Sequence, residues 1–135
     1  MNRAVLPHMR RQRRGAIVMV ASIYGRERGG RAAYQVVKSA QISLAKALAL
    51  ELAPDNVRVL SVAPGSILFP GGSWWRRREE DPEAMAAFVK RDMPLGRFGE
   101  PREVGDVICF LCSDRASLMT GASVQVDGGQ SYSLL

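Results

Sequence analysis

Two apolar runs, at residues 16–21 and 57–62, are separated by a long Ala-rich stretch. Both runs are rich in Val and nearly continuous in apolar character, which is typical of strands buried on both faces of a parallel sheet. The stretch at residues 31–53 repeats apolar side chains at helical spacing and predicts a long helix. A strand, a crossover helix and a second strand form a βαβ unit, so the pattern predicts an α/β protein with a parallel sheet.

The rest of the chain predicts three further elements and one insertion. Residues 3–10 have the pattern of a helix end, residues 101–113 that of a helix with proline in its first turn, and residues 123–126 that of a last strand. Residues 66–99 are rich in proline, glycine and charge, with one short helix expected near residues 82–90. The 135 residues are therefore expected to form one unit with three strands.

Candidate acid–base chemistry falls where the first strand ends and the long helix begins. Tyr34 and Lys38 are four residues apart and share one helix face, and Ser22 directly follows the first strand. An unperturbed tyrosine ionises near ~10, too high for efficient base chemistry at neutral pH. A neighbouring ammonium favours the phenolate, and a serine hydroxyl can hydrogen-bond a substrate oxygen. These three side chains are suited to moving a proton on and off an alcohol or a carbonyl.

The Tyr-x-x-x-Lys pair is a weak signal by itself, because a surface helix can carry a solvated lysine beside a half-buried tyrosine. Its position strengthens the catalytic interpretation, since open α/β sheets bind ligands at the carboxyl ends of their strands. Pro64-Gly65 ends the second strand at the same edge, although a plain turn would also explain that pair.

The sequence resembles the short-chain dehydrogenase/reductase family, and within it the 3-oxoacyl-carrier-protein reductase-like branch. Matching segments follow one another in family order along the whole chain. They include Val5-Leu6-Pro7-His8-Met9, Ser22-Ile23-Tyr24-Gly25, the Tyr34 to Lys38 segment, Asn56-Val57-Arg58-Val59, Val62-Ala63-Pro64-Gly65, Glu100-Pro101-Arg102-Glu103-Val104, Thr120-Gly121 and Val126-Asp127-Gly128-Gly129.

The resemblance implies a doubly wound, Rossmann-like parallel sheet, of which residues 1–135 supply the carboxyl-terminal, catalytic part. It implies an oxidoreductase that interconverts a carbonyl and an alcohol with NAD or NADP, by hydride transfer between nicotinamide and substrate carbon. By resemblance, Ser22 orients the substrate oxygen and Tyr34 gives or takes its proton. Lys38 favours the phenolate and binds the nicotinamide ribose, and the resemblance implies that Tyr34 contacts the cofactor as well. Epimerase and dehydratase relatives share the Tyr-x-x-x-Lys pair, but the Pro-Gly and Asp-Gly-Gly context disfavours them.

The resemblance also places four residues beside the nicotinamide: Pro64, Gly65, Ser66 and Ile67. Backbone groups of Ser66 and Ile67 are expected near its carboxamide. Phe69 departs from the family, which often has threonine there, so a hydroxyl contact to the cofactor is in question. Trp74 and Trp75 in the insertion either form a lid over the substrate or pack on the body or on a partner chain.

The resemblance covers only the second half of the family. The Gly-rich turn that cradles the cofactor's pyrophosphate belongs to the first half, together with the residues that separate NAD from NADP. No turn of that kind occurs in this sequence, so we expect a truncated chain. The alternative is an inactive fragment that acts only as an assembly module. Its catalytic motifs would then be inherited without catalysing a reaction.

The chain is basic, with a formal net charge of +6. The segments Arg10–Arg14 and Arg76–Arg78 could form a nucleic-acid patch. However, cations suit a helix end, and Glu79-Glu80 make the second segment a solvated mixed helix. Because no aromatic residues are interleaved for base stacking, we expect no nucleic-acid partner.

Several other site classes are disfavoured. Cys109 and Cys112 lie in an apolar helical pattern without a second ligand pair, so we expect buried thiols and no metal. His8 is the only histidine, which argues against a serine-hydrolase triad. No run has transmembrane length and no signal peptide is recognisable, so a cytoplasmic protein without a membrane partner is expected.

Two sheet edges are expected to remain unpaired. The strand at residues 16–21 would pair with a strand of the family's first half, and in the family the last strand and the helix at residues 101–113 commonly meet a second subunit. Exposed apolar edges favour association, so we expect a homo-oligomer or an aggregate rather than a monomer.

Overall fold

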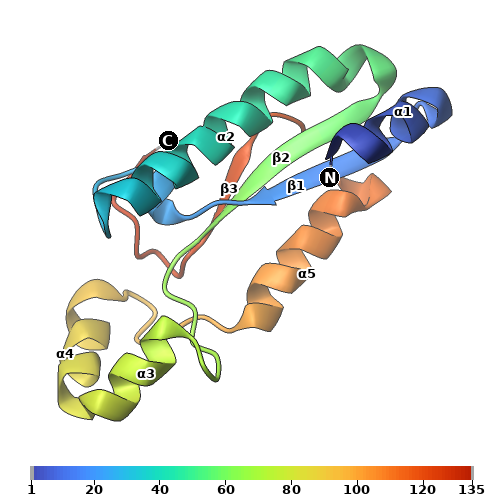
Figure 1. Cartoon of the computed structure of the whole chain (residues 1–135). Coiled ribbons are helices and arrows are strands. Elements are labelled where there is room, and N and C mark those ends of the chain that lie inside the picture. Colours follow the sequence, from blue (N-terminus) through green and yellow to red (C-terminus); the bar gives the residue numbers. More distant parts are fainter. Residues whose placement is uncertain (1, 135) are drawn as a thin grey trace.

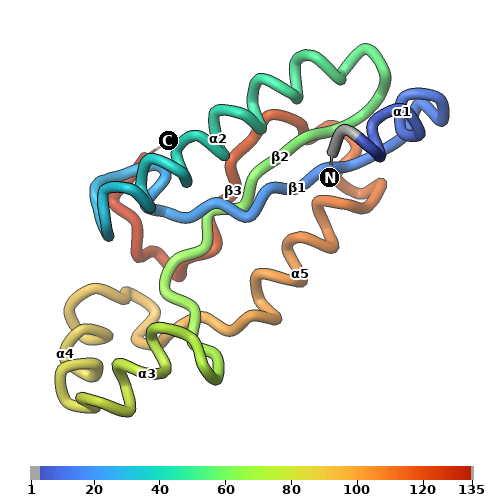
Figure 2. Tube along the Cα trace, viewed as in Figure 1, coloured from blue at the N-terminus to red at the C-terminus, as the bar shows by residue number. Residues whose placement is uncertain are grey.

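A three-stranded parallel sheet with helices on both faces forms the body of the computed structural model, which describes residues 2–134 (Figure 1). Two short helices form a separate lobe below the sheet (Figures 1 and 2). The elements are α1 (Asn2–Gln12), β1 (Gly15–Val20), α2 (Ala32–Leu52), β2 (Val57–Pro64), α3 (Ser73–Glu80), α4 (Pro82–Asp92), α5 (Pro101–Cys112) and β3 (Ser123–Val126).

The sheet has the strand order β1-β2-β3, and both pairings are parallel. Gly15 lies opposite Val57 in the first pair, and Ser61 lies opposite Ser123 in the second. The predicted α/β class and the three predicted strands are confirmed. Within the described chain, β1 and β3 each keep one unpaired edge, as expected, while β2 is the buried centre of the sheet.

Two apolar cores lie on the two faces of β2, because alternate residues of a strand point to opposite sides. On one face, α2 packs Ala45, Ala49 and Leu52 against Val57 and Val59, with α1 at the margin. On the other face, α5 packs Leu111 against Leu60, which is fully buried. Helices thus cover both faces at the centre, while β1 and β3 remain only partly buried.

The lobe is built from α3 and α4, and both helices were anticipated by their composition. The helix expected near residues 82–90 is α4, whose first turn is capped because the Asp81 carboxylate accepts from the Ala84 N–H at 2.9 Å. The charged segment at residues 76–80 lies in α3. Neither helix contains a fully buried residue, so the lobe has little core of its own.

An aromatic cluster holds the lobe together. The rings of Trp74 and Phe88 stack at 4.7 Å between centroids, and Phe98 lies 6.0 Å from Phe88. Trp75 lies outside this cluster and donates from Nε1 to Glu79 at 2.8 Å. Trp74 therefore packs against aromatic rings of the lobe and of the segment before α5. Whether the lobe closes over a substrate as a lid stays a prediction.

One ion pair fastens the segment between the lobe and α5. The Arg97 guanidinium donates to both carboxylate oxygens of Glu103, at 2.6 and 2.9 Å. The Glu100 N–H also donates to this carboxylate at 2.8 Å. The hydrogen bonds from Arg97 and Glu100 lower the pKa of Glu103 to about 2. Glu103 therefore stays ionised at neutral pH and caps the start of α5.

The prediction of buried thiols is wrong, because Cys109 and Cys112 are both exposed. The buried stripe of α5 consists of Val104 and Leu111, which are seven residues apart and therefore lie on one side of the helix. The two cysteines lie off that stripe. The apolar residues of α5 are spread widely enough around the helix that the sequence pattern includes both cysteines. The sheet, however, buries only the narrow side of α5 that carries Val104 and Leu111.

The basic segment at the end of α1, residues 10–14, makes contacts within the chain. Arg10 pairs with Glu51 at 3.1 Å and with Asp55 at 2.9 Å, and Arg14 pairs with Asp114 at 2.8 Å. These arginines connect α1 to the end of α2 and to the turn after α5, which gives the charge a structural explanation. Among residues 2–134, no helix has both the length and the apolar character that crossing a membrane requires.

Candidate active site

Ser22 lies at the carboxyl end of β1 and is nearly buried, with 7% of its surface exposed. The Ala21 N–H donates to the Val62 carbonyl at 2.8 Å, which extends the β1–β2 pairing up to the serine. The Ser22 hydroxyl oxygen accepts from the Tyr24 N–H at 3.2 Å and caps the short 3-10 turn Ile23–Gly25. Ser22 is thereby fixed at the edge of the sheet where ligands of α/β proteins bind.

Tyr34 and Lys38 lie together on the first turns of α2, as their spacing predicted. The Lys38 Nζ is 5.5 Å from the centroid of the Tyr34 ring. It donates to the Val20 carbonyl at 2.9 Å, at the last residue of β1. The tyrosine side is open, since 45% of Tyr34 is exposed. The ammonium is therefore anchored between the strand end and the tyrosine.

The structure thus brings the three predicted residues to one edge of the sheet without joining all of them. Lys38 bonds the strand that leads into Ser22, and it lies beside Tyr34. Among residues 2–134, no hydrogen bond connects Ser22 to Tyr34; the serine oxygen is engaged with its own turn. The Ser22 oxygen accepts from the Tyr24 N–H through a lone pair. The hydrogen of the same hydroxyl therefore remains able to donate to a substrate oxygen.

Gly25 lets this turn approach α2 closely. A Cβ at position 25 would lie 2.7 Å from the backbone carbon of Lys38 and 2.8 Å from its oxygen, which no side chain can tolerate. The Ser39 hydroxyl donates to the Gly25 carbonyl at 3.0 Å, and the Gln35 amide donates to the Glu27 carbonyl at 3.2 Å. These contacts hold the loop against the helix turns that carry Tyr34 and Lys38.

Ser66 is locked in place at the carboxyl end of β2. Its N–H donates to the Gln130 side-chain oxygen at 2.8 Å, and the Gln130 amide donates back to the Ser66 hydroxyl at 2.9 Å. Its carbonyl accepts from the Gly99 N–H at 3.0 Å. Gln130 was missed in the sequence. The available signal was its position, directly after Asp127-Gly128-Gly129 and therefore at the same edge of the sheet.

Ile67 differs from Ser66 in its backbone. Its neighbours bond the segment before α5, because the Leu68 N–H donates to the Gly99 carbonyl at 2.8 Å. The N–H and C=O of Ile67 itself have no hydrogen-bond partner among residues 2–134. Of the two backbones expected beside a carboxamide, the one at Ile67 is therefore available, whereas that of Ser66 is already satisfied.

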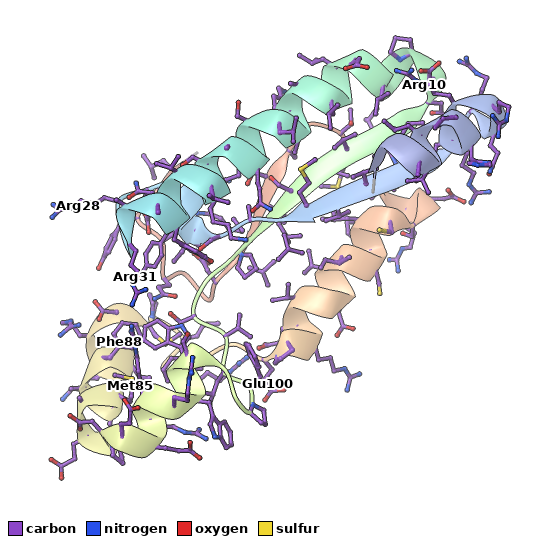
Figure 3. All side chains as sticks on the ribbon, viewed as in Figure 1. Arg10, Arg28, Arg31, Met85, Phe88 and Glu100 are labelled. Carbon is purple, nitrogen blue, oxygen red and sulfur yellow. The ribbon has the colours of Figure 1, made fainter. Side chains whose placement is uncertain are left out.

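A cavity of about 520 Å³ opens next to the turn that begins at Ser22. Its lining includes Ile23, Tyr24, Phe88 and Tyr132, from the turn, α4 and the carboxyl-terminal segment. Figure 3 shows Arg31 and Phe88 facing each other across the gap between body and lobe. The volume lies within the ~300–1,000 Å³ of typical small-molecule sites.

The Glu27 carboxylate organises the carboxyl-terminal side of this cavity. A single oxygen of Glu27 accepts from the Ser131 hydroxyl at 2.9 Å, the Tyr132 N–H at 2.8 Å and the Ser133 N–H at 3.0 Å. Three donors on one carboxylate oxygen hold the segment after β3 close to the loop that follows Ser22.

A substitution at Gly65 tests the paired hydrogen bonds between Ser66 and Gln130, which we call the lock. A Cβ at Gly65 would lie 2.7 Å from the Gln130 side-chain oxygen and 2.8 Å from the Asp127 Cβ. We expect Gly65→Ala to lower the free energy of unfolding by about 1–3 kcal/mol, as overpacking does. The matched control is Gly105→Ala, where a Cβ meets nothing within 4 Å, and which should stabilise α5 by about 0.5–1 kcal/mol. Thermal unfolding of both variants measures the difference, and equal melting temperatures would contradict the lock.

Comparison with known proteins gives consistent matches. Residues 1–131 match the family model described as enoyl-(acyl carrier protein) reductase. The chain is 43% identical over 128 residues to the 3-oxoacyl-[acyl-carrier-protein] reductase FabG of Thermotoga maritima, covering 93% of this chain and 49% of that protein. It is 38% identical over 132 residues to human dehydrogenase/reductase SDR family member 4, covering 96% and 45%. The chain spans about half the length of the curated relatives it matches.

Solved structures match over the same share. A 3-oxoacyl-[acyl-carrier protein] reductase with bound NAD from Brucella melitensis superposes with a TM-score of 0.81 at 39% identity, covering 95% of this chain and 45% of that one. L-sorbose reductase from Gluconobacter frateurii, complexed with NADPH and L-sorbose, superposes with a TM-score of 0.88 at 33% identity, covering 98% and 53%.

Proposed function

This chain belongs to the short-chain dehydrogenase/reductase family, and from this premise we propose that it carries the catalytic half of an oxidoreductase that interconverts a carbonyl and an alcohol with NAD or NADP. The observation that carries the proposal is the anchoring of Lys38. Its ammonium is bonded to the end of β1 and lies beside the Tyr34 ring, so the cation and the proposed acid–base phenol share one edge of the sheet.

In the proposed reaction, Tyr34 moves the proton. During reduction its phenol donates the proton to the oxygen of the carbonyl as the hydride arrives at the carbon. During oxidation the phenolate takes the proton back. The exposure of Tyr34 leaves the residue accessible to a substrate, and the Lys38 ammonium lies beside its ring.

Ser22 would hold the substrate oxygen. Its oxygen already accepts from the Tyr24 N–H, so its own O–H is the group that can donate to a carbonyl. Because the residue is nearly buried and its turn is capped, the hydroxyl is held in position before a substrate arrives. Ser22 is thus a positioning donor in the proposal, and Tyr34 is the acid and base.

The cofactor would meet this half at its nicotinamide end. The oxygen of a carboxamide can accept from the free N–H of Ile67, and its NH₂ group can donate to the free C=O of the same residue. When bound, the nicotinamide supplies or receives the hydride. Pro64, Gly65 and Ser66 would shape the loop that presents Ile67, with Ser66 fixed by Gln130. Two of the similar structures contain NAD or NADPH, which supports a nicotinamide cofactor.

The substrate would occupy the cavity of about 520 Å³ beside the Ser22 turn, with its carbonyl extending toward Ser22 and Tyr34, which do not belong to the lining. The similar proteins act on different carbonyl compounds by name, including L-sorbose and 3-oxoacyl groups, so family membership does not select one. The lining combines the aromatic rings of Tyr24, Phe88 and Tyr132 with charged side chains, which favours a compact carbonyl compound that also carries polar groups.

The proposed assembly is a homo-oligomer. Unpaired edges remain on β1 and β3, and α2 exposes Val36, Val37 and Leu44 with more than half of their surface in solvent. Burial of these groups against a second copy would stabilise a small core. Sedimentation of the purified chain is expected to give a species larger than a monomer, and a single monomeric boundary would contradict this.

The function is tested by cofactor consumption. A full-length protein that contains this segment should consume NADH or NADPH in the presence of small ketones and form the matching alcohol. The 135-residue chain alone should bind either dinucleotide more weakly than about 1 μM, because it offers contacts to the nicotinamide end only. A full-length protein that consumes neither cofactor would favour the alternative, an inactive assembly module.

A further inference from the structure

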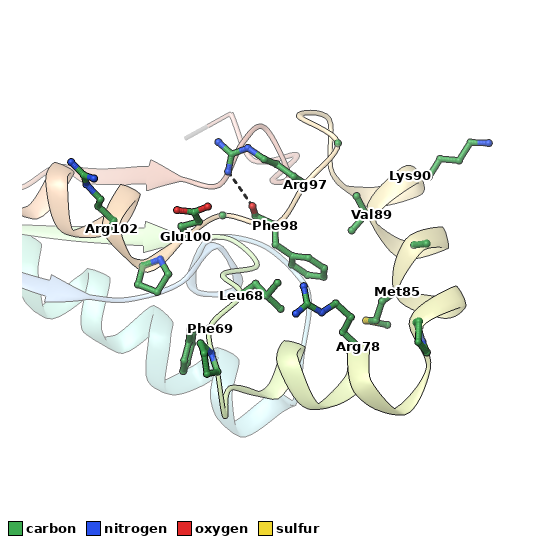
Figure 4. Close-up of a pocket in the computed structure, with 16 residues that line it drawn as sticks. Leu68, Phe69, Arg78, Met85, Val89, Lys90, Arg97, Phe98, Glu100 and Arg102 are labelled. Carbon is green, nitrogen blue, oxygen red and sulfur yellow. Dashed lines mark hydrogen bonds between the residues drawn. The ribbon is translucent and has the colours of Figure 1, made fainter.

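A second and larger cavity, of about 1140 Å³, lies between the lobe and the segment at residues 96–102 (Figure 4). It shares no lining residue with the cavity beside the Ser22 turn. Its walls are mainly apolar and come from the loop after β2, from α4 and from the segment before α5. They include Leu68, Phe69, Met85, Val89 and Phe98.

Arg78 reaches into this apolar space from α3. In Figure 4 its side chain extends between Leu68 and Phe98, whereas the side chains of Lys90 and Arg102 extend away from the cavity. The Arg78 guanidinium lies 4.4 Å from the centroid of the Trp75 ring. None of the ion pairs or side-chain hydrogen bonds found among residues 2–134 involves Arg78.

The other charges of the cavity do not compensate Arg78. Arg97 is bound by both oxygens of Glu103, so its charge is balanced. Glu100 is the one acidic residue in the lining, and it lies on the side of the cavity away from Met85 (Figure 4). A cation in an apolar concavity is stabilised when an anion pairs with it, and a guanidinium matches a carboxylate through two parallel hydrogen bonds.

We propose that this cavity binds an amphipathic carboxylate, an aliphatic chain with one terminal carboxylate group. The carboxylate would pair with Arg78, and the chain would lie along Leu68, Met85 and Val89. A neutral apolar ligand would leave Arg78 uncompensated, and a cationic amphiphile would be repelled by it. The lining begins one residue after Ile67 and includes Phe69, so the cavity adjoins the loop proposed to meet the cofactor. It contains none of Ser22, Tyr34 and Lys38, and the proposal does not rest on the hydride-transfer chemistry.

The test is a titration of the purified chain with monomeric dodecanoate, followed by tryptophan fluorescence, because Trp75 lies directly under Arg78. We expect saturable binding of one dodecanoate per chain. Arg78→Gln should weaken that binding about tenfold or more, since a charge-assisted pair is lost. The matched control is Arg77→Gln. Arg77 stacks on Trp74 in the same helix, at 4.9 Å, but does not line the cavity, so binding should be unchanged.

Met85→Glu supplies an independent variant, because it keeps Arg78 and places a negative charge on the opposite wall. It should weaken dodecanoate binding as strongly as Arg78→Gln, and circular dichroism of both variants should match the unaltered chain. Equal binding of dodecyltrimethylammonium would overturn the proposal, as would equal losses in Arg77→Gln and Arg78→Gln. Displacement of dodecanoate by NADH would assign the cavity to the cofactor cleft, and binding to lipid vesicles alone would assign it to a membrane surface. Either result would overturn it too.

Discussion

Tyr34→Phe is expected to lower carbonyl reduction at least about a hundredfold in a full-length protein that contains this segment. Phenylalanine keeps the ring that packs beside Lys38 and removes the hydroxyl that would carry the proton. No imidazole can replace it at this edge of the sheet, since His8 is the chain's single histidine and lies in α1. The measurement is the steady-state rate with saturating NADPH and a ketone that the unaltered protein reduces.

Dinucleotide affinity is the control for this variant. The proposed cofactor contacts are the Ile67 backbone and the Lys38 ammonium, and neither depends on the Tyr34 hydroxyl. NADPH binding should therefore change little while turnover falls. A variant that turns over at nearly the rate of the unaltered protein would end the assignment of Tyr34 as acid and base, and loss of both properties together would indicate a damaged fold.

The sequence was sufficient for the parts of the fold that depend on local patterns. Val-rich runs identified β1 and β2, and the spacing of Tyr34 and Lys38 placed both on one helix face. The position of Ser22 followed from its place directly after a strand, because every parallel strand of such a sheet ends at the same edge. These inferences require knowledge of neighbours within about one or two helix turns.

Contacts between residues that are far apart in the sequence could not be predicted from local patterns. Gln130 reaches Ser66 across 64 positions of sequence, so no local periodicity reports their paired hydrogen bonds. The cluster of Trp74 with Phe88 and Phe98 also joins separate segments. Both thiols of α5 are exposed, because the sheet covers only the strip of the helix that carries Val104 and Leu111. Each of these outcomes is set by tertiary packing rather than by propensity.

Arg58 is a charged residue within an apolar strand, and its hydrogen bonds connect that strand to neighbouring segments. It lies on β2, where its Nη1 donates to the Leu111 carbonyl at 2.7 Å and its Nη2 donates to the Ser113 carbonyl at 3.0 Å. The Leu111 carbonyl belongs to the last turn of α5, and the carbonyl groups of a last turn find no N–H partner within their own helix. A cation at this end also opposes the negative end of the helix dipole. Arg58 thus joins the central strand to the connection that leads into β3.

Arg58→Met should lower the free energy of unfolding by about 3 kcal/mol, since each buried carbonyl that loses its donor costs about 1–3 kcal/mol. Methionine keeps much of the aliphatic stem, so the change isolates the guanidinium. Urea unfolding of the purified chain measures it, with Arg102→Met as the control. Arg102 is exposed and has only a 3.7 Å contact with Asp106, so its loss should cost less than about 0.5 kcal/mol. Arg58→Lys should fall between the two, because one ammonium cannot span both carbonyls as a guanidinium does. If Arg58→Met and Arg102→Met unfold at the same urea concentration, the hydrogen bonds of Arg58 contribute nothing to stability, and the end of α5 is held by the packing of Leu111 alone.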